Sequence, residues 1–156
     1  MPAEIANLAL HEVYMRQALA QAELAEQRGE VPVGAVVVLE QKIIAAAYNQ
    51  NISLHDPCAH AEILALRAAG VMLGNHRLLG AQLYVTLEPC LMCIGAMIHA
   101  RIKEIIFGAF DSKTGACGSG VNALTLPIHN HQLNCMGGVL AQDCSHKLKA
   151  FFQAKR

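Results

Sequence analysis

The pattern of apolar and polar positions divides the chain into alternating helical and extended segments. Residues 6–28 are rich in Ala, Leu, Gln and Glu and stop before Gly29, which is typical of a helix ended by glycine. VGAVVVL at 33–39 and KIIAAAY at 42–48 are nearly continuous apolar runs, and the short link between them predicts a β-hairpin. The link lacks the Asn-Gly pair that favours a tight hairpin turn, so the pattern does not define the turn type.

The rest of the chain continues this alternation. The pattern predicts helices at 59–72, 90–101 and 139–154, strands at 83–87, 104–110 and 132–136, and a Gly- and Ser-rich loop at 111–120. Strands that alternate with helices indicate an α/β layered fold with parallel pairing in at least part of the sheet. Because no repeat, low-complexity tract or linker-like stretch interrupts the pattern, we expect a single domain over residues 1–156.

Composition adds a stable core and an uneven charge distribution. The chain is 54% hydrophobic and 15% charged, which predicts a folded globular protein and argues against disorder. The formal net charge is zero, but eight of the 12 acidic residues lie in 1–62 and nine of the 12 basic residues lie in 63–156. This asymmetry weakly favours a nucleic-acid partner.

The same composition bears on cellular location. The longest apolar run, VPVGAVVVL, is too short to span a bilayer, and the N-terminus lacks the basic region of a secretory signal. We therefore expect a cytoplasmic protein with no membrane partner. In a reducing compartment the 6 cysteines are expected to be free thiols or metal ligands rather than disulfides.

The segment TLEPCLMC places Cys90 and Cys93 directly after a proline, a spacing that fits a metal site, a redox pair or two core residues. The segment HDPCAHAEI supplies His60 and Glu62 at the start of the preceding predicted helix. We expect Cys90 and Cys93 in the first turn of one helix, where residues three apart share a face and the helix dipole favours thiolates. With His60 they form a three-ligand set that suits zinc and leaves a fourth position for water.

Glu62 makes this set look catalytic. It follows His60 by two residues and would lie near the metal without binding it. Zinc lowers the pKa of bound water from about 15.7 to about 7, and a nearby carboxylate can accept the released proton. His-x-Glu or Cys-x-x-Cys alone has little specificity, but the two together, about thirty residues apart and each at a predicted strand-to-helix junction, predict an enzyme.

His-x-Glu followed by Pro-Cys-x-x-Cys is the signature of the zinc nucleobase deaminases. Within that superfamily the sequence resembles the bacterial tRNA adenosine deaminase family over nearly the whole chain. The matching stretches are GEVPVGAV at 29–36, HDPCAHAEI at 55–63, LYVTLEPCLMCIGAMIHARI at 83–102 and FGAFDSKTGACGS at 107–119. The second and third identify the superfamily, and the first and last narrow it to the tRNA branch.

The resemblance implies a three-layer α/β/α cytidine deaminase-like fold around a mixed, roughly five-stranded sheet. It also implies a homodimer with one zinc per subunit. The substrate would be the anticodon loop of a tRNA, in which the adenosine at the wobble position is flipped into the pocket and hydrolysed to inosine.

The resemblance further assigns substrate contacts. Asn49 would read the flipped base, Ala61 would offer its backbone N–H to the base, and the loop at Asp111 would touch neighbouring nucleotides. The residues expected to wall the pocket are Val31, Pro32 and Val33.

Two residues depart from the family pattern, and two alternative functions stay open. Cys58 stands beside the metal loop, where the family usually has no thiol, and Phe110 precedes Asp111, where it could alter how flanking nucleotides stack. One alternative is a deaminase of another base, such as cytidine or guanine. The other is a non-catalytic, zinc-stabilised RNA-binding module, which predicts a closed four-ligand site with Cys58 as the nearest spare thiol.

Overall fold

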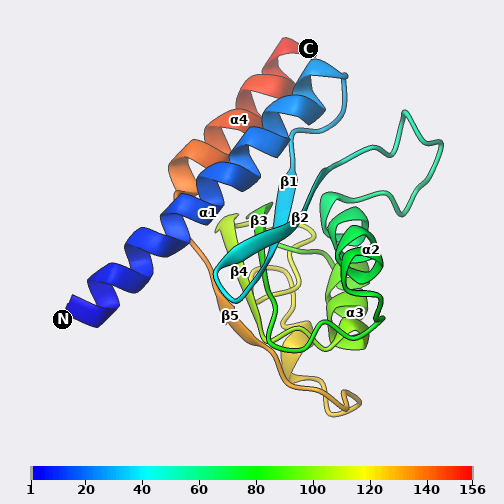
Figure 1. The fold of residues 1–156 in the computed structure, drawn as a ribbon. Helices are drawn as coiled ribbons and strands as arrows, with labels where there is room; N and C mark the ends of the chain where they lie inside the picture. The colour runs from blue at the N-terminus through cyan, green and yellow to red at the C-terminus, as the bar shows by residue number, and fades with distance from the viewer. Residues whose placement is uncertain (1, 156) are drawn as a thin grey trace.

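A computed structural model describes residues 2–155, in which helices and strands alternate as the sequence predicts (Figure 1). The helices are α1 (Pro2–Gln27), α2 (Ala61–Leu73), α3 (Leu91–Ala100) and α4 (Ala141–Ala154). The strands are β1 (Gly34–Leu39), β2 (Lys42–Tyr48), β3 (Gln82–Leu87), β4 (Glu104–Ala109) and β5 (Asn134–Met136). The predictions differ from these elements at their ends and in missing the short 3₁₀ helix η1 (Ala123–Thr125).

The five strands form one mixed sheet in the order β2-β1-β3-β4-β5. Strand β1 is antiparallel to both β2 and β3, whereas β3, β4 and β5 are parallel to one another. The carboxyl ends of β2, β3 and β4 and the beginning of β1 therefore lie at the same edge of the sheet. Residues far apart in the sequence meet at this edge, which is where ligands bind in many α/β folds.

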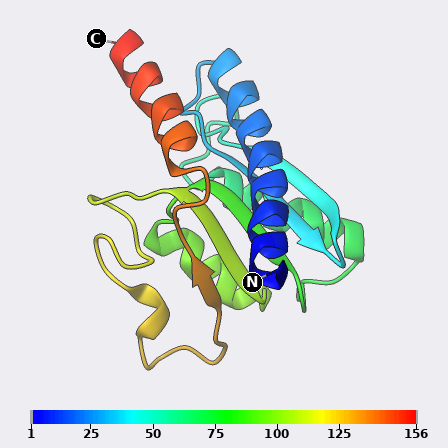
Figure 2. The same ribbon diagram turned by 90° about the vertical axis from the view of Figure 1, so that its left-hand side faces the viewer.

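Alternate residues along each strand face two separate cores. In β1, Val36 and Val38 pack with α1 and the start of α4, whereas Ala35 and Val37 pack on the side of α2 and α3. Helices α1 and α4 lie side by side on one face of the sheet, and α2 and α3 cover the other (Figure 1; Figure 2). The three-layer α/β/α arrangement that the family resemblance implies is thus confirmed.

Two glycines allow the α1 and α4 layer to approach the sheet closely. A Cβ atom at Gly34 would collide with the backbone of α1 at Ala18, and one at Gly108 would collide with the Cys144 side chain of α4. Because these side chains are absent, both helices rest directly on the strands.

The hairpin between β1 and β2 turns through residues that do not favour its geometry. Both Glu40 and Gln41 have positive φ, at 50° and 63°, as a type I′ turn requires. The Tyr14 hydroxyl donates a hydrogen bond of 2.9 Å to the Gln41 carbonyl, which attaches the turn to α1. This turn lies at the edge of the sheet opposite the carboxyl ends of β2, β3 and β4.

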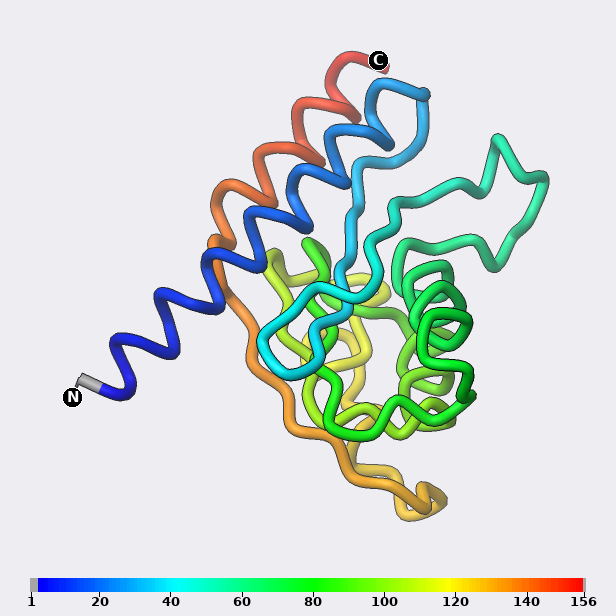
Figure 3. The backbone as a smooth tube through the Cα atoms, viewed as in Figure 1, coloured from blue at the N-terminus to red at the C-terminus, as the bar shows by residue number. Residues whose placement is uncertain are grey.

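Two connections make the longest excursions from the layers: 49–60 before α2, and 110–133 between β4 and β5 (Figure 3). Across residues 2–155, none of the helices combines the length and apolar character needed to cross a bilayer.

Candidate active site

The metal ligands His60 and Cys90 occupy matching positions at the beginnings of two helices. The sequence pattern placed them inside their first turns, but each lies one residue earlier, as the N-cap of α2 or α3 in extended backbone conformation. Neither side chain makes a capping hydrogen bond. Both side chains are therefore free to point at a common position, which Cys93 reaches from the first turn of α3.

The ligand atoms are spaced as a tetrahedral zinc site requires. His60 Nδ1 lies 3.6 Å from Cys90 Sγ and 3.4 Å from Cys93 Sγ, and the two sulfurs are 3.8 Å apart. Zinc bonds of about 2.3 Å to sulfur and about 2.0–2.1 Å to nitrogen would place tetrahedral ligands about 3.8 Å (S···S) and about 3.6 Å (N···S) apart. Within residues 2–155, His60, Cys90 and Cys93 are the one group of metal-ligating side chains gathered this closely. The donor set fits one zinc ion.

The two thiols divide a proton between them. The hydrogen bond with the Cys93 thiol, supported by His60, lowers the pKa of Cys90 to about 4 in spite of burial. The Cys90 side chain and burial together raise the pKa of Cys93. These shifts favour ionisation of Cys90 over Cys93, and zinc binding by both sulfurs would release the proton of Cys93.

Glu62 lies beside this site in an enclosed position. It is the second residue of α2, its side chain is 4% exposed, and burial raises the pKa of its carboxyl group. A carboxyl group whose pKa is raised toward neutrality is suited to accept and return a proton. His60, Cys90 and Glu62 line the same cavity, of about 230 Å³.

The cavity is smaller than the roughly 300–1,000 Å³ typical of drug-sized ligands, and it suits a single base. Its lining residues are Val31, Val33, Asn49, Asn51, His60, Glu62, Leu87, Glu88, Cys90, Asp111 and Thr114. Four of the predicted substrate contacts are therefore brought together there: Val31, Val33, Asn49 and Asp111. Pro32 and Ala61 are buried but are not among the lining residues.

Asn49 and Ala61 are joined directly. The Ala61 N–H donates a buried hydrogen bond of 2.7 Å to Asn49 Oδ1, so this N–H is already engaged. Because the donor is a backbone N–H, the side-chain oxygen of Asn49 must be the acceptor, which leaves the Asn49 amide nitrogen as the free donor. The N–H group that the family resemblance assigns to the base thus donates to Asn49 in the protein without substrate.

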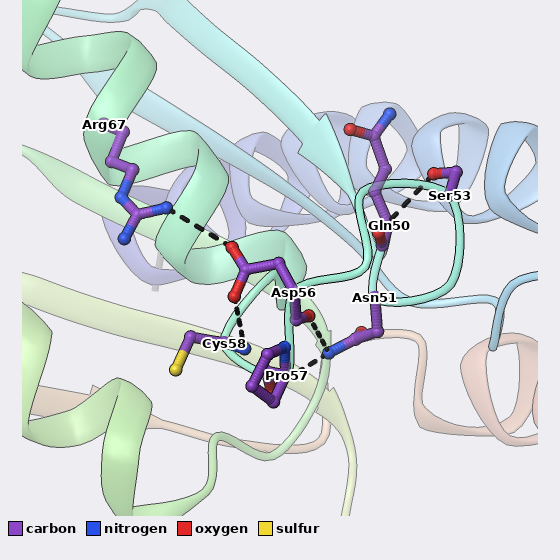
Figure 4. Close-up of polar contacts among 7 residues, drawn as sticks. All are labelled: Gln50, Asn51, Ser53, Asp56, Pro57, Cys58 and Arg67. Atoms are coloured by element: carbon purple, nitrogen blue, oxygen red, sulfur yellow. Dashed lines mark hydrogen bonds and ion pairs between the residues drawn. The ribbon is translucent and has the colours of Figure 1, made fainter.

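The connection that leads to His60 is shaped by its own polar groups (Figure 4). Asn51 Nδ2 donates to the carbonyls of Asp56 and Pro57, at 3.2 and 3.1 Å, and the Cys58 N–H donates to Asp56 Oδ1 at 2.8 Å. Cys58 itself is exposed and lines a groove formed by α2 and α3. It is not part of the ligand group, so the closed four-ligand site of the RNA-binding alternative is not formed.

Sequence reasoning missed two buried glutamates that hold the loops around the cavity. Glu30 accepts hydrogen bonds from the N–H groups of Ile52, at 3.0 Å, and Ser53, at 2.8 Å. Glu88 accepts four hydrogen bonds from the loop at 111–119. The sequence did contain a signal for both residues. Glu88 directly follows an apolar strand and precedes Pro89, and Glu30 stands shortly before an apolar strand and close to Pro32.

Comparisons with known proteins agree with this geometry. Residues 8–109 match the family model of the cytidine and deoxycytidylate deaminase zinc-binding region. The chain is 51% identical to the tRNA-specific adenosine deaminase of Haemophilus influenzae, over 93% of this chain and 84% of that protein. It is 46% identical to the Bacillus subtilis protein of the same name, over 93% and 90%. A solved structure from a study of A-to-I editing by tRNA:A34 deaminases at the wobble position of transfer RNA is 44% identical, with a TM-score of 0.85 over 86% of this chain and 98% of that one.

Proposed function

Because this chain belongs to the family of tRNA-specific adenosine deaminases, within the cytidine and deoxycytidylate deaminases, we propose that it hydrolyses adenosine to inosine at the wobble position of a tRNA. The observation that carries the proposal is the enclosed Glu62 carboxyl group beside a three-ligand zinc site. The partner is the anticodon loop, whose bases unstack at lower cost than those of a duplex. The cytoplasm, where tRNA matures in bacteria, is the expected location.

The reaction adds water to the ring carbon that bears the amine and releases ammonia. Zinc held by His60, Cys90 and Cys93 would supply a water whose pKa is near neutral. Glu62 would accept a proton from the attacking water and deliver it to the adjacent ring nitrogen as the new C–O bond forms. Glu62 would then move the proton of the added hydroxyl group to the departing amine, so that the C–N bond breaks, the C=O bond of inosine forms, ammonia leaves and the carboxyl group returns to its starting state.

Asn49 is the residue we assign to base recognition. Its oxygen is held by the Ala61 N–H, so its amide N–H₂ can donate to acceptor nitrogens of the purine. Val31 and Val33, just before β1, supply apolar wall, and Asp111 and Thr114, after β4, supply polar side chains to the same cavity. Pro32, which is buried and stands between Val31 and Val33 in the sequence, is assigned to the same wall, and Ala61 acts through Asn49.

We propose a homodimer that forms through the outer surface of α2 and α3. A groove of about 560 Å³ runs between these helices, lined mainly by apolar side chains that include Ile63, Leu66 and Met92. Neighbouring apolar side chains are exposed as well: Val71 on α2 at 85% and Leu91 on α3 at 60%. A second copy would cover this surface, and Met92→Asp is expected to shift the mass measured by light scattering from dimer to monomer.

The decisive experiment offers the purified protein an anticodon stem-loop with adenine at the wobble position. Inosine should form in this RNA. It should not form in a control stem-loop in which the adenine is moved from the wobble position to another position in the loop. Free cytidine and free guanine in parallel reactions test the alternative that another base is the substrate. If no inosine forms in the stem-loop but either free compound is deaminated, the proposed function is wrong and the protein is a deaminase of that other base.

A further inference from the structure

Glu88 is a fully buried carboxylate with every hydrogen-bonding position filled. Its side chain is 3% exposed and lies just beyond the end of β3. Oε1 accepts from the Asp111 N–H at 3.0 Å and from the Ser119 hydroxyl at 2.5 Å. Oε2 accepts from the N–H groups of Cys117 at 3.0 Å and Ser119 at 3.1 Å. The donors come from both ends of one loop, so the carboxylate ties the two ends of residues 111–119 together.

The loop is built to close around this charge. A Cβ atom at Gly115 would collide with the Glu88 carboxylate and with the Asp111 carbonyl, so the chain can cross here only as glycine. Asp111 then organises the exposed side of the loop: Oδ1 accepts from the N–H groups of Lys113 at 3.0 Å and Thr114 at 3.1 Å. Through this chain of contacts Asp111 and Thr114 come to line the cavity.

We propose that Glu88 is a positioning residue that fixes the 111–119 loop and thereby sets how tightly the anticodon loop binds, without taking part in proton transfer. The proposal rests on the proposed function, because it names RNA as the ligand whose affinity changes. Four donors on two oxygens leave the carboxylate no free position for a substrate proton. Glutamine cannot replace it, since its one oxygen cannot accept all four bonds and its N–H₂ group would face N–H donors of the loop.

The test compares Glu88→Gln with Glu104→Gln, the same chemical change at the opposite edge of the sheet, where Glu104 accepts a hydrogen bond from Gln82. For Glu88→Gln we expect KM for the anticodon stem-loop to rise about 10- to 100-fold, the range expected when buried donors lose their acceptor. The value of kcat and the zinc content should stay at wild-type levels. Amide hydrogen exchange should accelerate at Asp111, Cys117 and Ser119 and nowhere in β3 or β4. Glu104→Gln should change none of these quantities.

A second variant reaches the same contact from the loop side. Gly115→Ala would push the Glu88 carboxylate away from the loop while the glutamate itself is kept, so it should reproduce the rise in KM and the local exchange even if Glu88→Gln folds poorly. Unchanged KM with unchanged exchange would overturn the proposal. So would a loss of zinc or of kcat at unchanged KM, because Glu88 would then act through the metal site. If the wild type makes no inosine, the proposed function fails, while amide exchange still decides whether Glu88 holds the loop.

Discussion

Glu62 and Glu88 line the same cavity and are almost equally buried, yet their carboxyl groups have opposite properties. Burial raises the pKa of Glu62. Burial also opposes ionisation of Glu88, but hydrogen bonds from the Ser119 hydroxyl and from the N–H groups of Asp111, Ser119 and Cys117 hold its pKa below the ordinary value. The comparison teaches that converging hydrogen-bond donors can keep an enclosed carboxyl group ionised against the effect of burial, whereas a carboxyl group on which burial dominates is suited to carry protons.

Metal removal should separate the two glutamates most clearly. The role of Glu62 depends on a zinc-bound water, whereas Glu88 holds its loop with protein donors alone. We expect a chelator to abolish inosine formation while the amide groups of Asp111, Cys117 and Ser119 stay protected from exchange. Added zinc should restore turnover. Rapid exchange in the chelated protein would show that the loop depends on the metal, and the comparison would fail.

Glu62→Gln tests the proton-carrying member of the pair. Glutamine keeps the shape of the side chain but cannot accept a proton, so kcat should fall by about 10²–10⁴. Zinc content, measured by elemental analysis, should stay at one per chain because Glu62 is not a ligand. Near-normal turnover in this variant would rule out the mechanism.

Glu30→Gln extends the comparison to a third enclosed carboxylate. Glu30 is 1% exposed and, like Glu88, accepts loop N–H groups, those of Ile52 and Ser53. Leaving a buried donor without its charged acceptor should lower the free energy of unfolding by about 1–3 kcal/mol. Urea denaturation measures this difference, with Glu104→Gln as a control that should change stability little. Equal stability of the wild type and Glu30→Gln would mean that water replaces the carboxylate without cost.

The pH dependence of stability should show a smaller effect of the same carboxylate, Glu30. Burial opposes ionisation of Glu30, but the hydrogen bonds of Ile52 and Ser53 hold its pKa below the ordinary value. A lowered folded-state pKa stabilises the protein above the unfolded-state value of about 4.3, and this contribution is lost as pH falls through the folded-state pKa. The stability difference between wild type and Glu30→Gln should therefore be full near neutral pH and shrink in acid. A difference that persists unchanged in strong acid would contradict this assignment.

Much of the fold and the metal site could be predicted because both depend on local patterns. Apolar runs and glycine stops located the strands and helices, and the spacing of Cys90 and Cys93 on one helix indicated a shared ligand position. The positions of His60 and Cys90 as caps could not be read from the pattern, because helix propensity does not say at which residue the backbone becomes extended. The turn at Glu40 and Gln41 is left-handed despite its sequence, since the twist of the paired strands and the bond from Tyr14 override local preference.

The parts that escaped prediction depend on contacts between distant segments. Glu88 lies in the motif that contains Cys90 and Cys93. The N–H groups that donate hydrogen bonds to its carboxylate lie more than twenty residues later along the chain. Similarly, the bond between Ala61 and Asn49 forms only after β2 and α2 pack together. A single sequence gives the charge of such a residue and not the convergence of N–H groups upon it.

The reversed direction of β1 has a practical consequence. Since Val31 and Val33 reach the cavity just before β1 begins, the other end of that strand and the link at Glu40 and Gln41 lie on the far side of the molecule from the active site. A fluorescent label or a tethering domain inserted between Glu40 and Gln41 should leave inosine formation intact, provided that β1 and β2 still pair. This link is therefore the place to attach the enzyme to a support or a fusion partner.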